Sequence, residues 1–244
     1  LHLALENGGS ARDEMAWQLL ESMGSRCSRA GAARDAEQIA VKLGISFLVE
    51  NIRGPYEDRV IDEMVHQTAQ GKLANPCVAC NCGVKLDALF RKARDLNFDW
   101  VATGHGAQVT QDPRSGIAQL TQASDLSRDQ SFSLFELSQD NLRMLMMPLG
   151  NFPENRVSKL AAEFGLSPED STDPRELCYV YSPKFSDLMV SRISSGLRAA
   201  GNVRGPANQT MGEHPGLYRF QLGCRPEGLK FTEKGMEDLI VVNK

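Results

Sequence analysis

The alternation of strand-like and helix-like apolar segments constrains the fold of this chain more than any other feature of its sequence. Short apolar runs that suit buried strands are separated by longer segments in which apolar residues recur at helical spacing. We expect strands at 1–5, 45–49 and 100–103, helices at 11–20, 33–43, 58–70, 79–96 and 153–164, and a hairpin at 108–121. Strands that are joined through helices run parallel, so the pattern predicts an α/β fold whose parallel sheet is covered by helices on both faces.

The last part of the chain differs in character from the rest. After about residue 200, glycine and proline become frequent and the apolar runs are short, as at 217–222 and 239–242. This pattern is typical of a small β-rich domain. We therefore predict an α/β domain over 1–182 and a small β-rich domain over 203–244, with the boundary near 182–202.

Composition and charge exclude several classes of protein. The 244 residues are 41% hydrophobic and 24% charged, which argues against a disordered chain, a coiled coil or a collagen-like fibre. No apolar run approaches the length of about eighteen residues that a membrane span needs, and the first residues have no basic leader. We therefore expect no membrane span, no signal peptide and a cytoplasmic location. The net charge of −4 does not suggest a nucleic-acid binder overall. Residues 175–234 contain nine basic and five acidic side chains, a balance compatible with a surface that contacts a polyanion or with an ordinary solvent-exposed surface.

Six cysteines give the sharpest chemical signal in the sequence. Without a secretory signal, metal binding or redox chemistry explains them better than a disulfide framework does. Three of them, Cys77, Cys80 and Cys82, form a cluster at the start of the helix predicted near residue 79. The helix dipole and the unpaired amides there are expected to lower the pKa of the Cys80 thiol, and a thiolate is both a nucleophile and a metal ligand.

A structural zinc is a second interpretation of the same cysteines. Cys178, about a hundred residues farther along the chain, can meet the cluster in space, and four thiolates suit a zinc ion. The single residue between Cys80 and Cys82 is a tight spacing for two ligands of one tetrahedral ion. Cys27 and Cys224 suit the role of small buried side chains.

Two predicted loops are candidates for ligand contact. Gly104 follows the strand at 100–103, and a glycine lets a ligand approach the backbone at the carboxyl end of a parallel sheet, where such folds bind ligands. His105 beside it suits a structural histidine better than a catalyst. Arg128–Ser131 indicates a polar loop that leads into a buried element, and Asn7–Ser10 is a weak match to a phosphate-binding loop.

These and other motifs occur in a characteristic order along the chain. They are Asp35–Ala40, Leu43–Ile45, Asn75–Asn81, Ala102–His105, Arg128–Ser131, Glu176–Val180 and Leu217–Gly223. In this order and at these intervals they resemble the tRNA-specific 2-thiouridylases, enzymes that thiolate uridine 34 in the tRNA anticodon. The resemblance covers nearly the whole chain. The elements Asn-Pro-x-x-x-Cys-Asn and Arg-Asp-Gln-Ser are specific in combination, although each is weak alone.

The resemblance implies an ATP-pyrophosphatase-type α/β domain and a reaction in two stages. Members of the family use ATP, with Mg²⁺, to adenylate the uridine carbonyl oxygen, and a persulfide sulfur then displaces AMP. Adenylation turns a poor leaving oxygen into a good one, and a thiol of low pKa suits sulfur delivery. The implied partners are tRNA and a sulfur donor protein or sulfide.

The resemblance also assigns roles to residues of this chain. Cys80 matches the nucleophilic cysteine of the family, and Cys178 matches its persulfide-carrying cysteine. Leu3 and Gly104 match positions that contact ATP. The segment that meets the target base is matched by Asn75, Pro76 and Cys77, and a tRNA-contacting segment by Arg128, Asp129 and Gln130.

Three departures from the family pattern alter these expectations. The pyrophosphate-binding loop Ser-Gly-Gly-x-Asp-Ser is absent, and residues 1–5 align with the second strand of the family. We therefore expect the first strand and this loop to lie upstream, and the chain as written to bind ATP poorly. Cys77 stands where many members have Asp. Cys224 and Arg225 stand in place of Gln-Arg, and the last β-barrel domain of the family is expected to be truncated or missing.

Cys77 leads to the hypothesis of an iron–sulfur site. Together with Cys80 and Cys178 it resembles the three-cysteine site of iron–sulfur-dependent tRNA thiolation enzymes. Three thiolates would leave one iron of a [4Fe-4S] cluster free to hold a sulfide for transfer. The rival hypothesis is cluster-free persulfide chemistry, in which Cys80 and Cys178 form a disulfide after turnover.

Two other classes of function are compatible with the sequence. One is a zinc-stabilised, non-catalytic RNA-binding protein that has no ATP loop. The other is an ATP-pyrophosphatase that acts on a small molecule. The segment 128–131 and the appended β-rich domain argue against the small-molecule enzyme.

Overall fold

The computed structural model describes residues 2–4, 32–70, 72, 74–166, 189–193, 198–220, 230–231 and 241. The predicted helix at 11–20 lies outside these residues, as do Cys27, Cys178 and Cys224. The described residues belong to two compact units. Unit 1 holds 2–4, 32–59 and 77–166, and unit 2 holds the described residues of 60–76 and 189–241.

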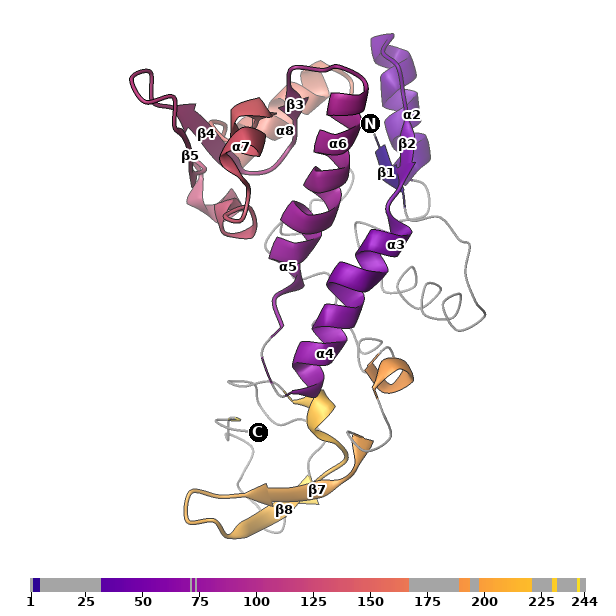
Figure 1. The fold of residues 1–244 in the computed structure, drawn as a ribbon, viewed down its shortest axis with the longest axis vertical. Helices are drawn as coiled ribbons and strands as arrows, with labels where there is room; N and C mark the ends of the chain where they lie inside the picture. Colours follow the sequence, from indigo (N-terminus) through magenta and orange to yellow (C-terminus); the bar gives the residue numbers. More distant parts are fainter. Residues whose placement is uncertain are drawn as a thin grey trace. The chain divides into compact units, whose positions relative to one another are not determined.

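Unit 1 contains two pairs of parallel strands (Figure 1). Strand β1 (His2–Ala4) pairs with β2 (Val49–Asn51), and the helix α2 (Ala32–Leu43) lies between them in the chain. Strand β3 (Val101–Ala102) pairs with β6 (Leu145–Met146). Parallel pairing through helical connections confirms the predicted α/β class. The strand predicted at 45–49 begins later, because its parallel ladder extends only along the three residues of β1.

Two long helical stretches carry the segments between β2 and β3. The first consists of α3 (Arg53–Tyr56), η1 (Glu57–Asp62) and α4 (Glu63–Ala69). The second consists of α5 (Pro76–Val78), η2 (Ala79–Leu86) and α6 (Asp87–Asp95), which Figure 1 draws as one continuous helix. Both helices were predicted, but each starts earlier than expected. The second begins at Pro76, where the fixed φ and missing N–H of proline suit the first turn of a helix.

The described part of unit 1 has a hydrophobic core around α6 and β3. The predicted hairpin forms as β4 (Ala107–Gln111) and β5 (Ala118–Gln122), and it covers this core together with α7 (Gln139–Met144). Alternation along the hairpin turns alanine and aliphatic side chains inward and Gln and Thr side chains outward. The core residues are Leu86, Phe90, Ala93, Val101, Ala107, Ala118, Leu134, Leu137, Leu142, Leu145 and Met147.

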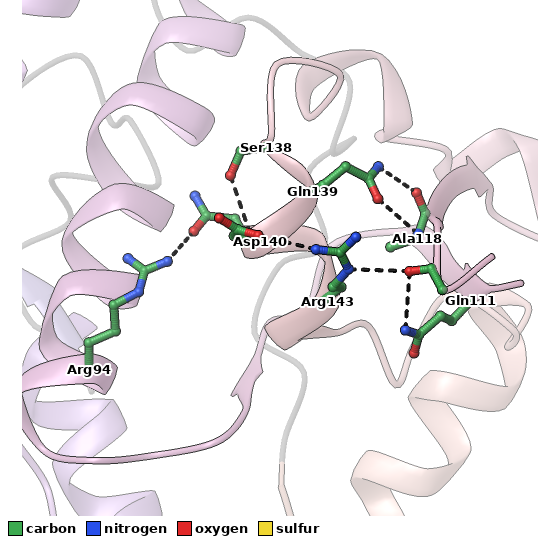
Figure 2. A network of polar contacts seen from close by, with 9 residues as sticks. Arg94, Gln111, Ala118, Ser138, Gln139, Asp140 and Arg143 are labelled. Carbon is green, nitrogen blue, oxygen red and sulfur yellow. Dashed lines mark hydrogen bonds and ion pairs between the residues drawn. The ribbon is translucent and has the colours of Figure 1, made fainter. Parts of the chain in front are cut away.

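Polar contacts fix α7 against the hairpin, as Figure 2 shows. The Gln139 amide accepts from the Ala118 N–H at 3.0 Å and donates to the Ala118 carbonyl at 2.8 Å. Arg143 donates to the Gly116 carbonyl at 3.2 Å and to Asp140 at 3.2 Å. Between Gln139 and Arg143 on α7, Asn141 accepts from Arg94 of α6 at 2.6 Å. These contacts connect α7 to both α6 and the hairpin.

The predicted helix near 153–164 is confirmed as α8 (Glu154–Glu163). Its carboxyl end is joined to α2, because the Lys42 ammonium donates to the carbonyl oxygens of Phe164 and Gly165 at 3.1 and 2.9 Å. A cation at the end of a helix also interacts favourably with the helix dipole.

The described residues of unit 2 after position 200 form an antiparallel sheet, in agreement with the predicted β-rich character. Its strands are β7 (Gly201–Arg204), β8 (Thr210–His214) and β9 (Lys230–Phe231), in the order β7-β8-β9. The apolar run at 217–222 begins with a 3-10 turn, η6 (Leu217–Arg219), rather than a strand. The preceding Gly216 has φ of +147°, which turns the chain so that Tyr218 is buried. No helix among the described residues has the length and apolar character to cross a bilayer.

Candidate functional site

The cysteine cluster lies on the helical stretch that starts at Pro76. Cys77 belongs to the first turn and is half-buried, and Cys80 and Cys82 belong to η2, where Cys80 is 9% exposed. Cys77 and Cys80 are three residues apart and lie within one helical turn of each other. The turns of η2 are π-helical, and Arg59 of η1 donates to the Gly83 carbonyl at 2.6 Å. Wide turns of this kind occur often at functional sites.

Cys82 faces away from Cys80. Residues two apart on a helix point to nearly opposite sides. The Cys82 thiol donates to the Ser133 carbonyl at 3.4 Å and packs against the core of unit 1. Burial is the largest influence that raises the pKa of Cys82, and the nearby charge of Glu136 acts in the same direction. Cys82 is therefore a neutral, structural thiol.

The end of β3 meets this helix through His105. The His105 ring contacts the Thr103 hydroxyl through Nδ1 at 2.8 Å and the Asn81 amide oxygen through Nε2 at 3.4 Å. An amide oxygen only accepts, so the Nε2 atom carries the proton and Nδ1 accepts from Thr103. Burial, and to a smaller extent the charge of Lys85, lowers the pKa of His105 to about 4. His105 is thus a neutral ring that joins the strand end to the residue after Cys80, in agreement with a structural role.

The loop 123–133 lies against the same strand end. The Gly106 N–H donates to the Gln130 side-chain oxygen at 2.9 Å, and the Gln130 N–H donates to the Gly106 carbonyl at 2.7 Å. A Cβ atom on Gly106 would overlap the carbonyl oxygen of Arg128, so only glycine fits there. The loop continues into η4 (Ser131–Ser133), whose last carbonyl accepts from Cys82. Three segments that are distant in sequence therefore meet at one place in unit 1.

Two aspartates shape the loop. Asp125 accepts from the N–H and hydroxyl of Ser127 at 3.0 and 2.6 Å, and from the Glu154 N–H at the start of α8 at 3.3 Å. The Ser127 side-chain bond, followed by the backbone bonds, lowers the pKa of Asp125. Asp129 accepts from the Ala123 N–H at 2.9 Å and from the Ser131 hydroxyl at 2.8 Å. Both are Asp-x-Ser pairs, so the aspartate turns were visible in the sequence, but Asp125 was given no role there and Asp129 was assigned only a tRNA contact.

The structure brings together part of the predicted site. Cys80 and Gly104 lie on segments that His105 and Asn81 join, and Gln130 is bonded to Gly106. Of the other predicted tRNA-contacting residues, Asp129 is used in loop contacts, and Arg128 forms an ion pair with Glu154. Leu3 lies in β1, Asn75 is exposed before the helix, and Pro76 is buried at its start. Cys178 lies outside the described residues.

Asn81, Gly106, Ser133 and Asp125 take part in this arrangement but were not predicted. A second glycine two residues after Gly104 was the one sequence signal of a close approach there. No three His, Cys, Asp or Glu side chains gather as a metal site within the described part of the chain. Cys77 and Cys80 supply thiols of the kind that bind zinc or iron–sulfur clusters, within one helical turn of each other.

Comparison with known families agrees with this arrangement. The sequence profile described as "tRNA methyl transferase HUP domain" matches residues 13–182, which is more than half of the chain. The chain belongs to this family. The matched range of the HUP-domain family includes the cysteine cluster, the end of β3 and the loop 123–133. It agrees with the α/β class and the ATP-pyrophosphatase-type fold predicted from the sequence.

Curated relatives extend the likeness beyond the HUP domain. The chain is 32% identical over 225 residues to the tRNA-specific 2-thiouridylase MnmA of Clostridioides difficile, covering 88% of this chain and 60% of that protein. It is 33% identical over 221 residues to MnmA of Symbiobacterium thermophilum, covering 90% and 56%. It is 34% identical over 199 residues to MnmA of Carboxydothermus hydrogenoformans, covering 82% and 54%. The resemblance to tRNA-specific 2-thiouridylases is confirmed, and the chain spans at most 60% of the length of these relatives.

Proposed function

We propose that this protein catalyses the ATP-dependent 2-thiolation of uridine 34 in the tRNA anticodon. The observation that carries the proposal is the meeting of three segments in unit 1: the cysteine helix, the end of β3 and the loop 123–133. Relatives that are 32% and 33% identical to this chain over 225 and 221 residues are named tRNA-specific 2-thiouridylases. A location in the cytoplasm, where tRNA is modified, belongs to the same proposal.

The proposed reaction has an activation step and a sulfur-transfer step. The uridine O2 attacks the α-phosphorus of ATP, and pyrophosphate leaves with its electron pair. The terminal sulfur of a persulfide on Cys178 then attacks C2, and AMP leaves with the former O2. The Cys80 thiolate attacks the Cys178 sulfur, which releases 2-thiouridine and leaves a Cys80–Cys178 disulfide. A thiol reductant restores the two cysteines, and the outer sulfur of a donor protein's persulfide is then transferred to the Cys178 thiolate, with the donor's thiolate as leaving group. Sulfide can act only before that reduction, by attacking the Cys178 sulfur of the disulfide, which forms the Cys178 persulfide and releases the Cys80 thiolate.

The remaining predicted residues take supporting roles in this proposal. The exposed Asn75 and the half-buried Cys77 flank Pro76 at the start of the helix, where they would meet the extruded base. Leu3 lies within β1 and Gly104 follows β3 by two residues, and ATP with Mg²⁺ would lie at the carboxyl ends of these strands. The segment of Arg128, Asp129 and Gln130 would border the path of the tRNA.

A [4Fe-4S] cluster is the rival form of the sulfur-transfer step, in which Cys80 and Cys178 are ligands and not a persulfide pair. Cys77 and Cys80, which lie within one helical turn of each other, would be two of its ligands, and Cys178 would be the third. A cluster bound by three thiolates keeps one iron open for an exogenous sulfide. Cys82 does not belong to this set, because its thiol is directed to the Ser133 carbonyl.

The test measures 2-thiouridine in unmodified tRNA after incubation with the complete protein, ATP, Mg²⁺, a thiol reductant and, in parallel reactions, a persulfide sulfur donor or sulfide. Cys80→Ala is expected to abolish product, whereas the matched variant Cys82→Ala keeps most of it. Product formation by Cys80→Ala would refute the assigned chemistry. Binding of tRNA without product in the unaltered protein would favour the non-catalytic RNA-binding protein, and pyrophosphate release with a small molecule in place of tRNA would favour the other enzyme class.

A separate measurement decides between the cluster and the bare persulfide pair. Iron, acid-labile sulfide and zinc are determined per chain in anaerobically purified protein. About four irons with matching sulfide, both lost in Cys77→Ser, are expected for the cluster. Zinc without iron would favour a structural site, and full iron content in Cys77→Ser would remove Cys77 from the ligand set.

A further inference from the structure

Gln130 is turned inward, toward the strand end, and not toward a ligand. Its side-chain oxygen accepts from the Gly106 N–H at 2.9 Å, and its own N–H donates to the Gly106 carbonyl at 2.7 Å. A single residue thus satisfies both backbone groups of Gly106, as a neighbouring strand would. Gly106 is buried, so neither of its polar groups has bulk water as an alternative partner.

The same residue connects Gly106 to the cysteine helix. The Gln130 carbonyl accepts from the Ser133 hydroxyl at 2.9 Å and from the Ser133 N–H at 3.0 Å. The Ser133 carbonyl in turn accepts from Cys82, two residues after Cys80. The chain of bonds therefore runs from the strand end, through Gln130 and Ser133, to the helix that carries Cys80.

The close approach of the two backbones makes this connection specific. A Cβ on Gly106 would overlap the Arg128 carbonyl oxygen, so the loop lies directly against the strand end. Asp129 holds the loop in this shape through its bonds to Ala123 and Ser131. The loop is thus fixed on both sides of Gln130.

We infer that Gln130 is a positioning residue, which sets the distance between the strand end at Gly104–Gly106 and the Cys80 helix, and that its side chain does not contact tRNA. The effect of Gln130 on the thiolation rate rests on the proposed function, whereas its effect on the Gly106 amide does not. The positioning role replaces the tRNA contact that the resemblance assigns to this side chain. In the proposed reaction, the strand end lies beside ATP and the helix carries the attacking thiol, so their separation affects the reacting geometry and not the affinity for tRNA.

Two substitutions separate positioning from contact. Gln130→Met keeps the length of the side chain but removes the acceptor for the Gly106 N–H. Gln130→Glu keeps the acceptor and replaces the amide N–H₂ by an oxygen, so a tRNA contact would be lost in both variants. The primary measurement is amide hydrogen exchange of Gly106 by NMR in the full chain. The amide of Asp112, which donates to the Ile117 carbonyl at 2.9 Å in the hairpin, serves as the internal control.

In Gln130→Met, the Gly106 amide is expected to exchange about tenfold faster while the Asp112 amide is unchanged. In Gln130→Glu, both amides keep their protection. The dissociation constant for tRNA is expected to change less than about threefold in both variants, and the thiolation rate at saturating tRNA falls in Gln130→Met alone.

Unchanged Gly106 exchange in Gln130→Met would overturn the inference, and so would a tRNA dissociation constant raised about tenfold in both variants with Gly106 protected. If amide exchange of Gly106 and Asp112 is accelerated equally in Gln130→Met, that variant has unfolded unit 1 as a whole, and Gln130→Glu then decides. Retained protection of the Gly106 amide with unchanged tRNA affinity in Gln130→Glu supports the positioning role, and lost tRNA affinity refutes it. The exchange measurement needs no thiolation, so a failure of the proposed function is seen separately, as absence of product in the unaltered protein.

Discussion

Gly106→Ala tests the contact on which the candidate site depends. The added methyl group would overlap the Arg128 carbonyl oxygen, with the Arg128 carbonyl carbon at 3.1 Å and the Arg128 Cβ at 3.5 Å. The obstacle is backbone, which cannot rotate away as a side chain would. The loop must therefore move from the strand end, and the two bonds between Gly106 and Gln130 lengthen or break.

The size of the effect follows from these contacts. Forcing an extra methyl group into a packed site destabilises a protein by about 1–3 kcal/mol. Each of the two hydrogen bonds contributes about 1 kcal/mol. Replacing glycine returns about 0.5–1 kcal/mol, because the unfolded chain loses freedom. The net expectation is a loss of about 2–4 kcal/mol in the free energy of unfolding.

The assay is urea unfolding followed by circular dichroism, with Gly104→Ala as the matched control. A Cβ on Gly104 would have its nearest contact at 3.8 Å, with the Leu149 Cδ1 atom, and Gly104 is not in the left-handed region of φ. Its substitution is expected to change the stability by less than about 1 kcal/mol. If Gly106→Ala and Gly104→Ala unfold at the same urea concentration, the loop does not lie against the strand end, and the argument for Gln130 fails with it.

Three further outcomes are expected. His105 has a pKa of about 4 when folded and about 6.5 when unfolded, so only the unfolded chain takes up its proton between these values. The contribution of the neutral His105 ring to the free energy of unfolding is then fully present above about pH 6.5 and is lost as the pH falls, by about 2 kcal/mol at pH 5. His105→Gln should remove this part of the pH dependence of urea unfolding. If the free energy of unfolding of His105→Gln depended on pH as that of the unaltered protein does, a buried neutral ring would be contradicted. The pKa of Cys82 is raised by burial, so Cys82 should react with iodoacetamide at pH 8 more slowly in the native protein than in the urea-unfolded protein, as judged by peptide mass spectrometry, and equal rates would contradict a neutral, structural thiol. Gln139→Ala removes both bonds to Ala118 and should lower the free energy of unfolding by about 1–2 kcal/mol, whereas no change in the urea midpoint would show that these bonds do not hold α7 to the hairpin.

Much of the secondary structure of unit 1 follows from local sequence. The helices around residues 33–43, 79–96 and 153–164 and the hairpin at 108–121 appear where apolar spacing and turn residues predicted them. Such features depend on near neighbours, because helical and strand periodicity are set by the backbone. The strand at 45–49 was misplaced because its ends depend on the length of its partner β1, which the local sequence does not encode.

The sequence by itself determined the α/β class, the order of the motifs and the family of this protein. Tertiary structure alone decided how the motif residues are used. Cys82 is directed to Ser133, which is 51 positions away in the sequence. His105 contacts Asn81, and Gln130 is bonded to Gly106, and the partners in each of these two pairs are 24 positions apart. The physical reason is that burial and hydrogen bonding set the charge and direction of a polar side chain. Both depend on segments that the chain brings together only when it folds.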